Sequence, residues 1–133
     1  MDVLLQNAER SGIGLEGMDL ARRVSLPNEE PVFVRSFDDS LLAARKLSDG
    51  DATPLLVVNG IGANLAPWRK PLADVVRERT VVTWDHRGLL DSPAPESERR
   101  DPGTHAEDAV SVLDHYGIER CVIASWSNGA RIA

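Results

Sequence analysis

Three short apolar runs, each followed directly by a turn of small and polar residues, constrain the fold of this chain more than any other feature. The runs are LLVV at 55–58, TVVTW at 80–84 and CVIA at 121–124. An unbroken apolar run of this length is typical of a strand that is buried on both faces, as in a parallel sheet covered by helices. The sequence therefore predicts three buried strands.

Helical patterns fill the two intervals between these runs. In the first interval, four apolar residues share one helical face: Trp68, Leu72, Val75 and Val76. Two prolines, Pro67 and Pro71, are expected to confine the regular part of this helix to its later turns. In the second interval, Thr104 and Glu107 have the spacing of a capping box, and Gly117 stands where a glycine ends a helix. Strands that alternate with helices predict a three-layer α/β/α fold with a mostly parallel sheet.

The chain before the first apolar run divides at about residue 31. Residues 31–47 read as β-forming PVFVRSF, a DDS turn and LLAARKL, which together predict a β-hairpin. Residues 1–30 show no clear periodicity. We therefore assign 1–30 to an N-terminal extension and 31–133 to the folded domain.

The residues that carry chemistry follow the three predicted strands, at 59–62, 85–88 and 125–129. Ligands bind at the carboxyl ends of parallel strands, where loops open and helices begin. In the third segment, SWSNG, Ser127 stands between small residues two positions away on either side, Ser125 and Gly129. This spacing, directly after a buried strand, is typical of a nucleophile elbow, a sharp turn that exposes the serine oxygen.

Taken together, these motifs resemble the N-terminal half of an α/β-hydrolase. The segment 31–47 resembles the first hairpin of that family, and LLVVNGIG resembles its third strand and oxyanion loop. TVVTWDHRGLLDSP is similar to the fourth strand with its Asp-x-Arg-Gly turn, and CVIASWSNG to the fifth strand and elbow. Two positions depart from the family pattern, because Asn59 replaces the usual histidine of the oxyanion loop and Ser125 replaces the first glycine of the elbow.

The resemblance implies a serine hydrolase that acts on a small carboxylic ester, or a related acyl substrate, through an acyl-enzyme. Ser127 would be the nucleophile, and the backbone N–H groups of Ile61 and Asn128 would stabilise the oxyanion. Four small residues would support these two turns: Ser125, Gly129, Gly60 and Gly62. Trp126 and Trp68 are candidates for the acyl pocket, although aromatic residues beside buried strands more often pack in the core. This chemistry requires no metal and no cofactor.

The histidine base and the acid of such a site follow the serine in this family. The residues after Ser127 are NGARIA, and none of them can serve. The three histidines, His86, His105 and His115, all precede the elbow. Because a domain of this type needs about 200 to 250 residues, we expect the chain to be truncated after the elbow and the full-length parent to be the enzyme.

Other interpretations remain open. Residues 59–62 and Asp85 also suit a dinucleotide-binding module, but its third glycine would fall at Leu65. A catalytically inactive hydrolase-like chain is a further alternative, in which Ser127 is only a turn residue. Asp85 and Arg87 are interpreted as a structural turn pair rather than as catalytic groups.

Charge and composition narrow the classes of partner. The net charge of -6 disfavours nucleic acid and anionic lipid, so we expect a small-molecule ester or acyl substrate, with no nucleic acid and no membrane partner. The single cysteine, Cys121, excludes an internal disulfide. The N-terminus lacks the pattern of a secretory signal, and a cytoplasmic location is the resulting expectation.

Overall fold

The computed structural model describes residues 24–133, so most of the assigned N-terminal extension lies outside the described residues. The strands are β1 (Val32–Arg35), β2 (Leu41–Val58), β3 (Arg79–Trp84) and β4 (Val122–Ser125). The helices are α3 (Arg69–Leu72) and α4 (Pro102–His115), and three 3-10 turns are η1 (Ala66–Trp68), η2 (Val75–Arg77) and η3 (Ser127–Arg131). The expected hairpin and all three expected strands are therefore present, with 55–58 forming the second half of β2.

Strand β2 bends back on itself, so that both of its halves pair with β3. In the first half, Ala44 to Lys46 pair with Trp84 to Val82 in opposite directions. In the second half, Leu55 to Val57 pair with Val81 to Thr83 in the same direction. Gly50 permits the bend, since a Cβ atom there would lie 2.3 Å from the carbonyl oxygen of Glu78.

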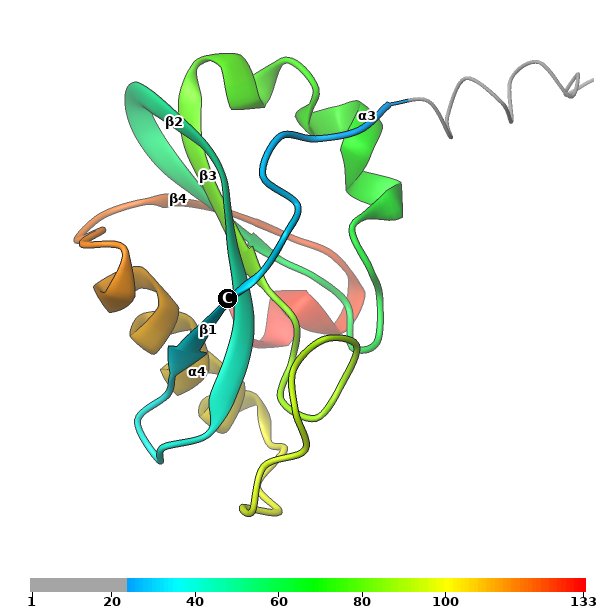
Figure 1. Ribbon diagram of the computed structural model, residues 1–133, viewed down its shortest axis with the longest axis vertical. Coiled ribbons are helices and arrows are strands. Elements are labelled where there is room, and N and C mark those ends of the chain that lie inside the picture. Colours follow the sequence, from blue (N-terminus) through cyan, green and yellow to red (C-terminus); the bar gives the residue numbers. More distant parts are fainter. Residues whose placement is uncertain (1–23) are drawn as a thin grey trace, which may run out of the picture.

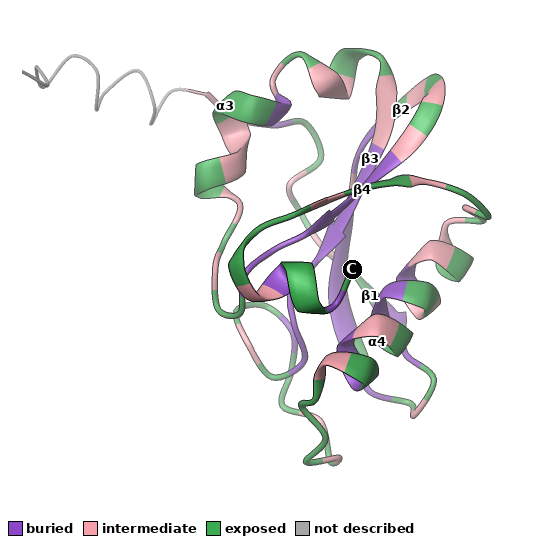
Figure 2. Cartoon of the chain, turned by 180° about the vertical axis from the view of Figure 1, so that it is seen from behind, coloured by how far each residue is buried: buried purple, intermediate pink, exposed green. Residues whose placement is uncertain are grey.

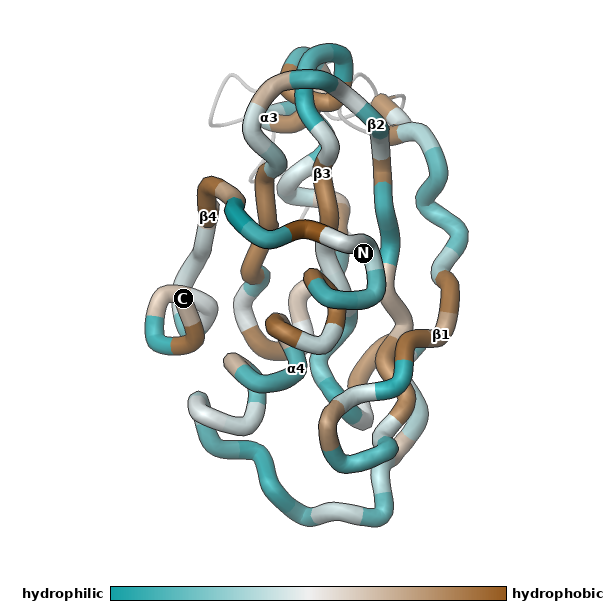
Figure 3. Tube along the Cα trace, turned by 90° about the vertical axis from the view of Figure 1, so that its left-hand side faces the viewer, coloured by the Kyte–Doolittle hydropathy of each residue, from teal (hydrophilic) through white to brown (hydrophobic). Residues whose placement is uncertain are grey.

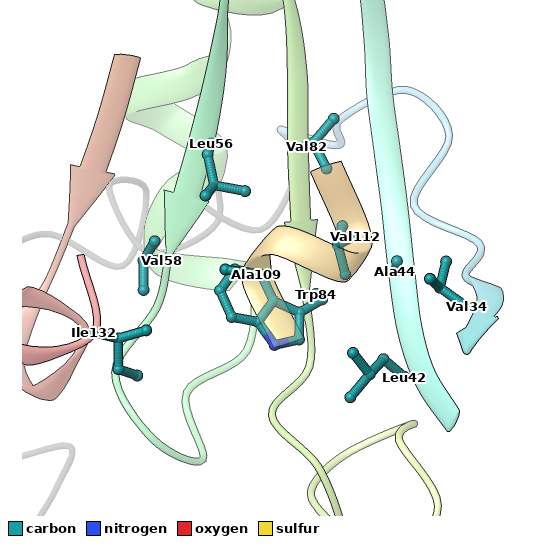
Figure 4. Close-up of a cluster of buried hydrophobic side chains, with 10 residues drawn as sticks. All are labelled: Val34, Leu42, Ala44, Leu56, Val58, Val82, Trp84, Ala109, Val112 and Ile132. Carbon is teal, nitrogen blue, oxygen red and sulfur yellow. The ribbon is translucent and has the colours of Figure 1, made fainter. Parts of the chain in front are cut away.

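The complete sheet has β3 at its centre. β1 runs antiparallel to the first half of β2, and β4 runs parallel to the second half. In space, the order is β1, first half of β2, β3, second half of β2 and β4 (Figure 4). The expected parallel arrangement thus holds around the second half of β2, whereas the N-terminal hairpin adds antiparallel pairs.

Helical segments cover both faces of this sheet (Figure 1). Successive residues of β2 point to opposite faces of the sheet, as the pleat of a strand requires. Leu56 and Val58 pack with Ala109 and Val112 of α4 (Figure 4). Leu55 and Val57 pack with the segment 65–76 on the other face. The protein therefore has the expected three-layer α/β/α architecture. In Figure 3 the strands carry most of the hydrophobic residues, and the loop before α4 is mainly hydrophilic.

Two details of the helices differ from the sequence prediction. The N-cap of α4 is Asp101, not Thr104, and its carboxylate accepts a hydrogen bond from Thr104 N at 3.0 Å. Aspartate is an equally good N-cap, and Pro102 then occupies the first helical position, where proline is favoured. In the first interval, the α-helical part is the early segment α3, and the later turns form the 3-10 turn η2.

Strand β4 is exposed, contrary to the prediction of a buried strand. Val122 and Ile123 are 49% and 45% exposed, whereas the central strand β3 is largely buried (Figure 2). Within residues 24–133, β4 lies at the edge of the sheet with a partner only on the side of β2. An apolar run indicates a tendency to be buried, but burial also requires a covering layer.

Packing extends back beyond the expected boundary at residue 31. Leu26 is buried in the same apolar cluster as Leu47 and Leu72. Glu29 forms a bidentate ion pair with Arg69, in which both N···O distances are 2.9 Å. These residues attach the start of the described chain to the layer that contains α3.

No helix within residues 24–133 has the length and apolar character needed to cross a lipid bilayer.

Candidate active site

The turn after β4 has the geometry of a nucleophile elbow. Ser127 has a φ of 55°, a left-handed conformation that a residue with a Cβ seldom adopts, and its side chain is exposed. It is the first residue of η3 and is separated from the end of β4 by Trp126, whose N–H donates to Val58 O at 3.2 Å. The predicted strand, turn and helical segment are therefore all present around Ser127.

Gly129 allows this turn to approach β2 closely. A Cβ atom at Gly129 would lie 2.2 Å from the carbonyl oxygen of Val58 and 2.8 Å from that of Asn59. Because both obstacles are backbone atoms, no side-chain rotation can relieve the clash. The small residue that the elbow pattern requires at this position is thus explained by contact between η3 and the end of β2.

We expect Gly129→Ala to destabilise the protein by about 1–3 kcal/mol, the usual effect of overpacking. The cause is the clash between the added methyl group and the backbone of β2. Urea denaturation followed by circular dichroism measures the change. Ala130→Ser, at an exposed neighbouring position, is the matched control and should change stability by less than about 0.5 kcal/mol. Equal stability of the two variants would contradict the close packing of the elbow.

The loop after β2 lies against the elbow. A Cβ atom at Gly60 would be 3.5 Å from the Cβ atom of Ser127, so the predicted oxyanion loop is in van der Waals range of the serine. Gly62 has a φ of 73°, and Ile61 between the two glycines is exposed. The structure thus brings 59–62 and 125–129 together, as expected for loops at the carboxyl ends of adjacent parallel strands.

The two predicted oxyanion donors lie on these adjacent segments. Asn128 is the second residue of η3, whose N-cap is Trp126, and the first N–H groups of a helical turn have no acceptor within that turn. Ile61 N follows Gly60, whose Cβ position is 3.5 Å from the Cβ atom of Ser127. Backbone N–H groups on two neighbouring turns can stabilise a developing oxyanion beside a serine oxygen.

The two tryptophans occupy different environments. Trp68 is half-buried and packs in the apolar cluster of the 65–76 layer, and its Nε1 donates to Asn59 Oδ1 at 3.0 Å. Trp126 is 52% exposed and adjoins Ser127 in sequence. Core packing, the commoner role of an aromatic residue, therefore applies to Trp68 and not to Trp126.

Asp85 and Arg87 do not form the expected turn pair. Asp85 Oδ2 accepts from Arg45 at 3.0 Å, whereas the guanidinium of Arg87 binds Asp108 and Asp38. Both residues are structural, but each fixes a different part of the fold.

Arg87 is the centre of a buried ionic network that the sequence did not indicate. Its side chain is inaccessible to solvent, and it bonds both oxygens of Asp108, at 2.9 and 2.6 Å, as well as Asp38 at 2.8 Å. Ser36 Oγ donates to Asp108 at 2.5 Å. Burial alone would raise the pKa of Asp108, but these hydrogen bonds outweigh it and lower the pKa, and Arg87 likewise lowers the pKa of Asp38. The network ties the turn after β3 to α4 and to the β1–β2 turn.

The structure places the three histidines away from the role of a catalytic base. The Nε2 of His86 is 3.0 Å from the carbonyl oxygen of Asn59, which makes this nitrogen the donor. His105 is buried beside His86, with ring centroids 4.8 Å apart, and His115 lies in the last turn of α4. His86 and His105 therefore pack inside the domain, where His86 supports the loop after β2.

Burial lowers the pKa of His86 below its usual value of 6.5, and nearby His105 lowers this pKa further. The hydrogen bond to Asn59 and the charges of Asp108 and Asp85 raise the pKa, but their effect is smaller. The unfolded chain therefore binds a proton at His86 at a higher pH than the folded chain. As a result, we expect the free energy of unfolding to fall as pH decreases below about 6.5. Urea titrations at pH 7.5, 6.5 and 5.5 measure this slope.

His86→Gln, which retains a donor for Asn59 O, should reduce the slope between pH 6.5 and 5.5. His115→Gln, at an exposed position on α4, is the control and should keep the wild-type slope. The same slope in the wild type and both variants would contradict the assignment of a buried, neutral His86.

Comparison with known proteins decides the family. A family model described as the alpha/beta hydrolase fold matches residues 53–133, which include β3, α4, β4 and the elbow. The chain belongs to the alpha/beta hydrolase fold family. The hydrolase match extends over both strand-end loops described above and does not support the dinucleotide-binding alternative.

Individual relatives within the family include lipases and esterases. The (lyso)-N-acylphosphatidylethanolamine lipase of Bos taurus is 28% identical over 122 residues, which are 90% of this chain and 33% of that protein. The solved esterase RhEst1 from Rhodococcus sp. ECU1013 superimposes with a TM-score of 0.66 at 28% identity, over 77% of this chain and 38% of that one. A hydrolase from Pseudomonas aeruginosa PA01 gives a TM-score of 0.66 at 29% identity, over 78% and 39%. The chain thus spans about a third of the length of the curated relatives it matches.

Proposed function

We propose that this chain supplies the nucleophile and the oxyanion hole of a serine hydrolase that cleaves small carboxylic esters or related acyl substrates. The observation that carries the proposal is Ser127 itself, exposed at a φ of 55° on a turn packed against the end of β2. Membership of a hydrolase family and similarity to a lipase and an esterase support it.

The proposed reaction proceeds through an acyl-enzyme. Ser127 Oγ attacks the ester carbonyl carbon and loses its proton to a general base, and the carbonyl oxygen becomes an oxyanion held by Ile61 N–H and Asn128 N–H. Collapse of this intermediate expels the alcohol, which takes a proton from the conjugate acid of the base. Water then attacks the acyl-enzyme in the same manner and releases the carboxylic acid and free Ser127.

In the proposed site, the general base and the acid that orients it are not among residues 24–133. His86 and His105 are buried, and His115 lies in the last turn of α4. None of the residues after Ser127 is a histidine or an acid. We therefore propose that a histidine and a carboxylate that are not among residues 24–133 complete the site.

The proposal is tested by expressing the full open reading frame that encodes this chain and measuring hydrolysis of p-nitrophenyl acetate, butyrate and octanoate. We expect turnover with an initial burst of p-nitrophenol close to one equivalent per protein, because acylation precedes slower deacylation. An NAD titration serves as the comparison and should be flat. A folded product that binds NAD and releases no p-nitrophenol would reject the proposal.

A further inference from the structure

Asn59 has an unusually complete set of hydrogen bonds for a residue in a loop. Its side chain is buried, and its Nδ2 donates to the carbonyl oxygens of Ala63 and Asn64, both at 2.9 Å. Its Oδ1 accepts from Gly60 N at 2.9 Å and from Trp68 Nε1 at 3.0 Å. Both amide hydrogens and both acceptor positions of the oxygen are therefore used.

These hydrogen bonds hold the backbone immediately before Ile61 and immediately after Gly62. The Oδ1 bond fixes the backbone before Ile61, and the two Nδ2 bonds fix the backbone after Gly62. A turn bond from Ala63 N to Gly60 O, at 3.0 Å, closes the same loop. Ile61 itself is exposed, and among residues 24–133 no atom lies within 4 Å of a Cβ position at Gly62, so Asn59 is the main support of this short loop within the described part of the chain.

The backbone of Asn59 connects the loop to the other two strand ends. Its carbonyl oxygen is 3.0 Å from Nε2 of His86, on the turn after β3. The same oxygen would be 2.8 Å from a Cβ atom at Gly129, so it also contacts the elbow after β4. Asn59 thus contacts both the elbow after β4 and the turn after β3.

We propose that Asn59 is a positioning residue, which acts through the loop and holds the Ile61 N–H in the geometry needed to stabilise the oxyanion. This inference rests on the proposed function. A donor that is displaced by about 1 Å reduces catalysis by roughly 10²-fold, and loss of an oxyanion donor reduces kcat by about 10²- to 10³-fold. The ground-state ester makes little use of this donor, so the effect falls on kcat rather than on KM.

Asn59→Asp and Asn59→Ala, made in the full open reading frame, test this role in the p-nitrophenyl butyrate assay. Aspartate keeps the oxygens that accept from Gly60 and Trp68 but loses both donors to Ala63 and Asn64. We expect kcat to fall about 10- to 100-fold for Asn59→Asp and at least as far for Asn59→Ala, with KM within about threefold of wild type. The rate of labelling by a fluorophosphonate, whose phosphoryl oxygen occupies the oxyanion position, should fall in parallel.

Two further variants separate positioning from general instability. Leu47→Ala removes a buried side chain from the first half of β2, close to the bend at Gly50, and should lower the melting temperature while kcat of the folded protein stays within about twofold of wild type. Trp68→Phe removes only one of the four bonds and should lower kcat about two- to fivefold, which keeps the proposal testable if the Asn59 variants do not fold.

The graded order of kcat, with Trp68→Phe above Asn59→Asp and Asn59→Ala, supports the proposal. Wild-type kcat in folded Asn59→Asp, or in Trp68→Phe where the Asn59 variants do not fold, would overturn it. An equal loss of kcat in Leu47→Ala would also overturn it, because the effect would then follow stability. An inactive wild-type protein would instead reject the proposed function, and the positioning role with it.

Discussion

Replacement of Ser127 by alanine is expected to lower kcat/KM for p-nitrophenyl butyrate by roughly 10⁴-fold or more in the product of the full open reading frame. The variant keeps the oxyanion donors and the substrate site but lacks the oxygen that forms the acyl-enzyme. The burst of p-nitrophenol should disappear together with steady-state turnover. Ser127 is exposed, and alanine does not remove a buried contact, so the melting temperature should change little.

Ser111→Ala is the matched control, since it removes a hydroxyl group from α4, where Ser111 Oγ donates to Glu107 O. Its kcat/KM should stay within about twofold of wild type. Turnover that persists at the wild-type level in Ser127→Ala would show that another group is the nucleophile. In that case, the catalytically inactive interpretation of the elbow would be correct.

Replacement of Arg87 by methionine is expected to destabilise the fold by about 3–5 kcal/mol, because it leaves the carboxylate of Asp108 buried without its cation. The side chains of Arg87 and Asp108 are both inaccessible to solvent, and Asp38 is only 20% exposed. The loss is a large part of the roughly 5–15 kcal/mol that stabilises a typical domain. Urea denaturation should show a much lower midpoint, or the variant should be recovered only as insoluble protein.

Arg35→Ala is the control for this experiment. Arg35 pairs with Asp39 at 3.7 Å, but both side chains are largely exposed, and such a pair contributes less than about 1 kcal/mol. A similar midpoint for Arg35→Ala and Arg87→Met would contradict the buried network.

Low pH should destabilise the protein in the same way as Arg87→Met, because Asp38 and Asp108 have lowered pKa values in the folded state. Their stabilisation is present above the ordinary aspartate pKa and is lost as the pH falls below it.

Local patterns in the sequence predicted the parts of the fold that depend on local rules. The apolar runs at 55–58 and 80–84 form buried strands, and the strand before the elbow pairs in parallel with β2, as expected. Gly117 ends α4 at a φ of 67°. Serine at a positive φ and glycine in backbone contact also follow from the spacing of the SWSNG segment.

Features that depend on distant partners were not predictable from the sequence. Arg87 is 49 residues from Asp38 and 21 from Asp108, and no local pattern links these positions. The hydrogen bonds of Asn59 are closer in sequence, but their simultaneous formation depends on how the loop closes over the end of β2. A polar residue directly after a buried strand and before a glycine is the only local signal of such a role. The exposure of β4 likewise depends on what packs against it, which an apolar run does not specify.

The central claim is that Ser127 is the nucleophile, and covalent labelling tests it most directly. The product of the full open reading frame is incubated with a fluorophosphonate, digested and examined by tandem mass spectrometry. We predict one adduct per molecule, located on Ser127, and none in Ser127→Ala. An adduct on a different residue, or a folded protein that turns over esters while Ser127 stays unmodified, would contradict the claim.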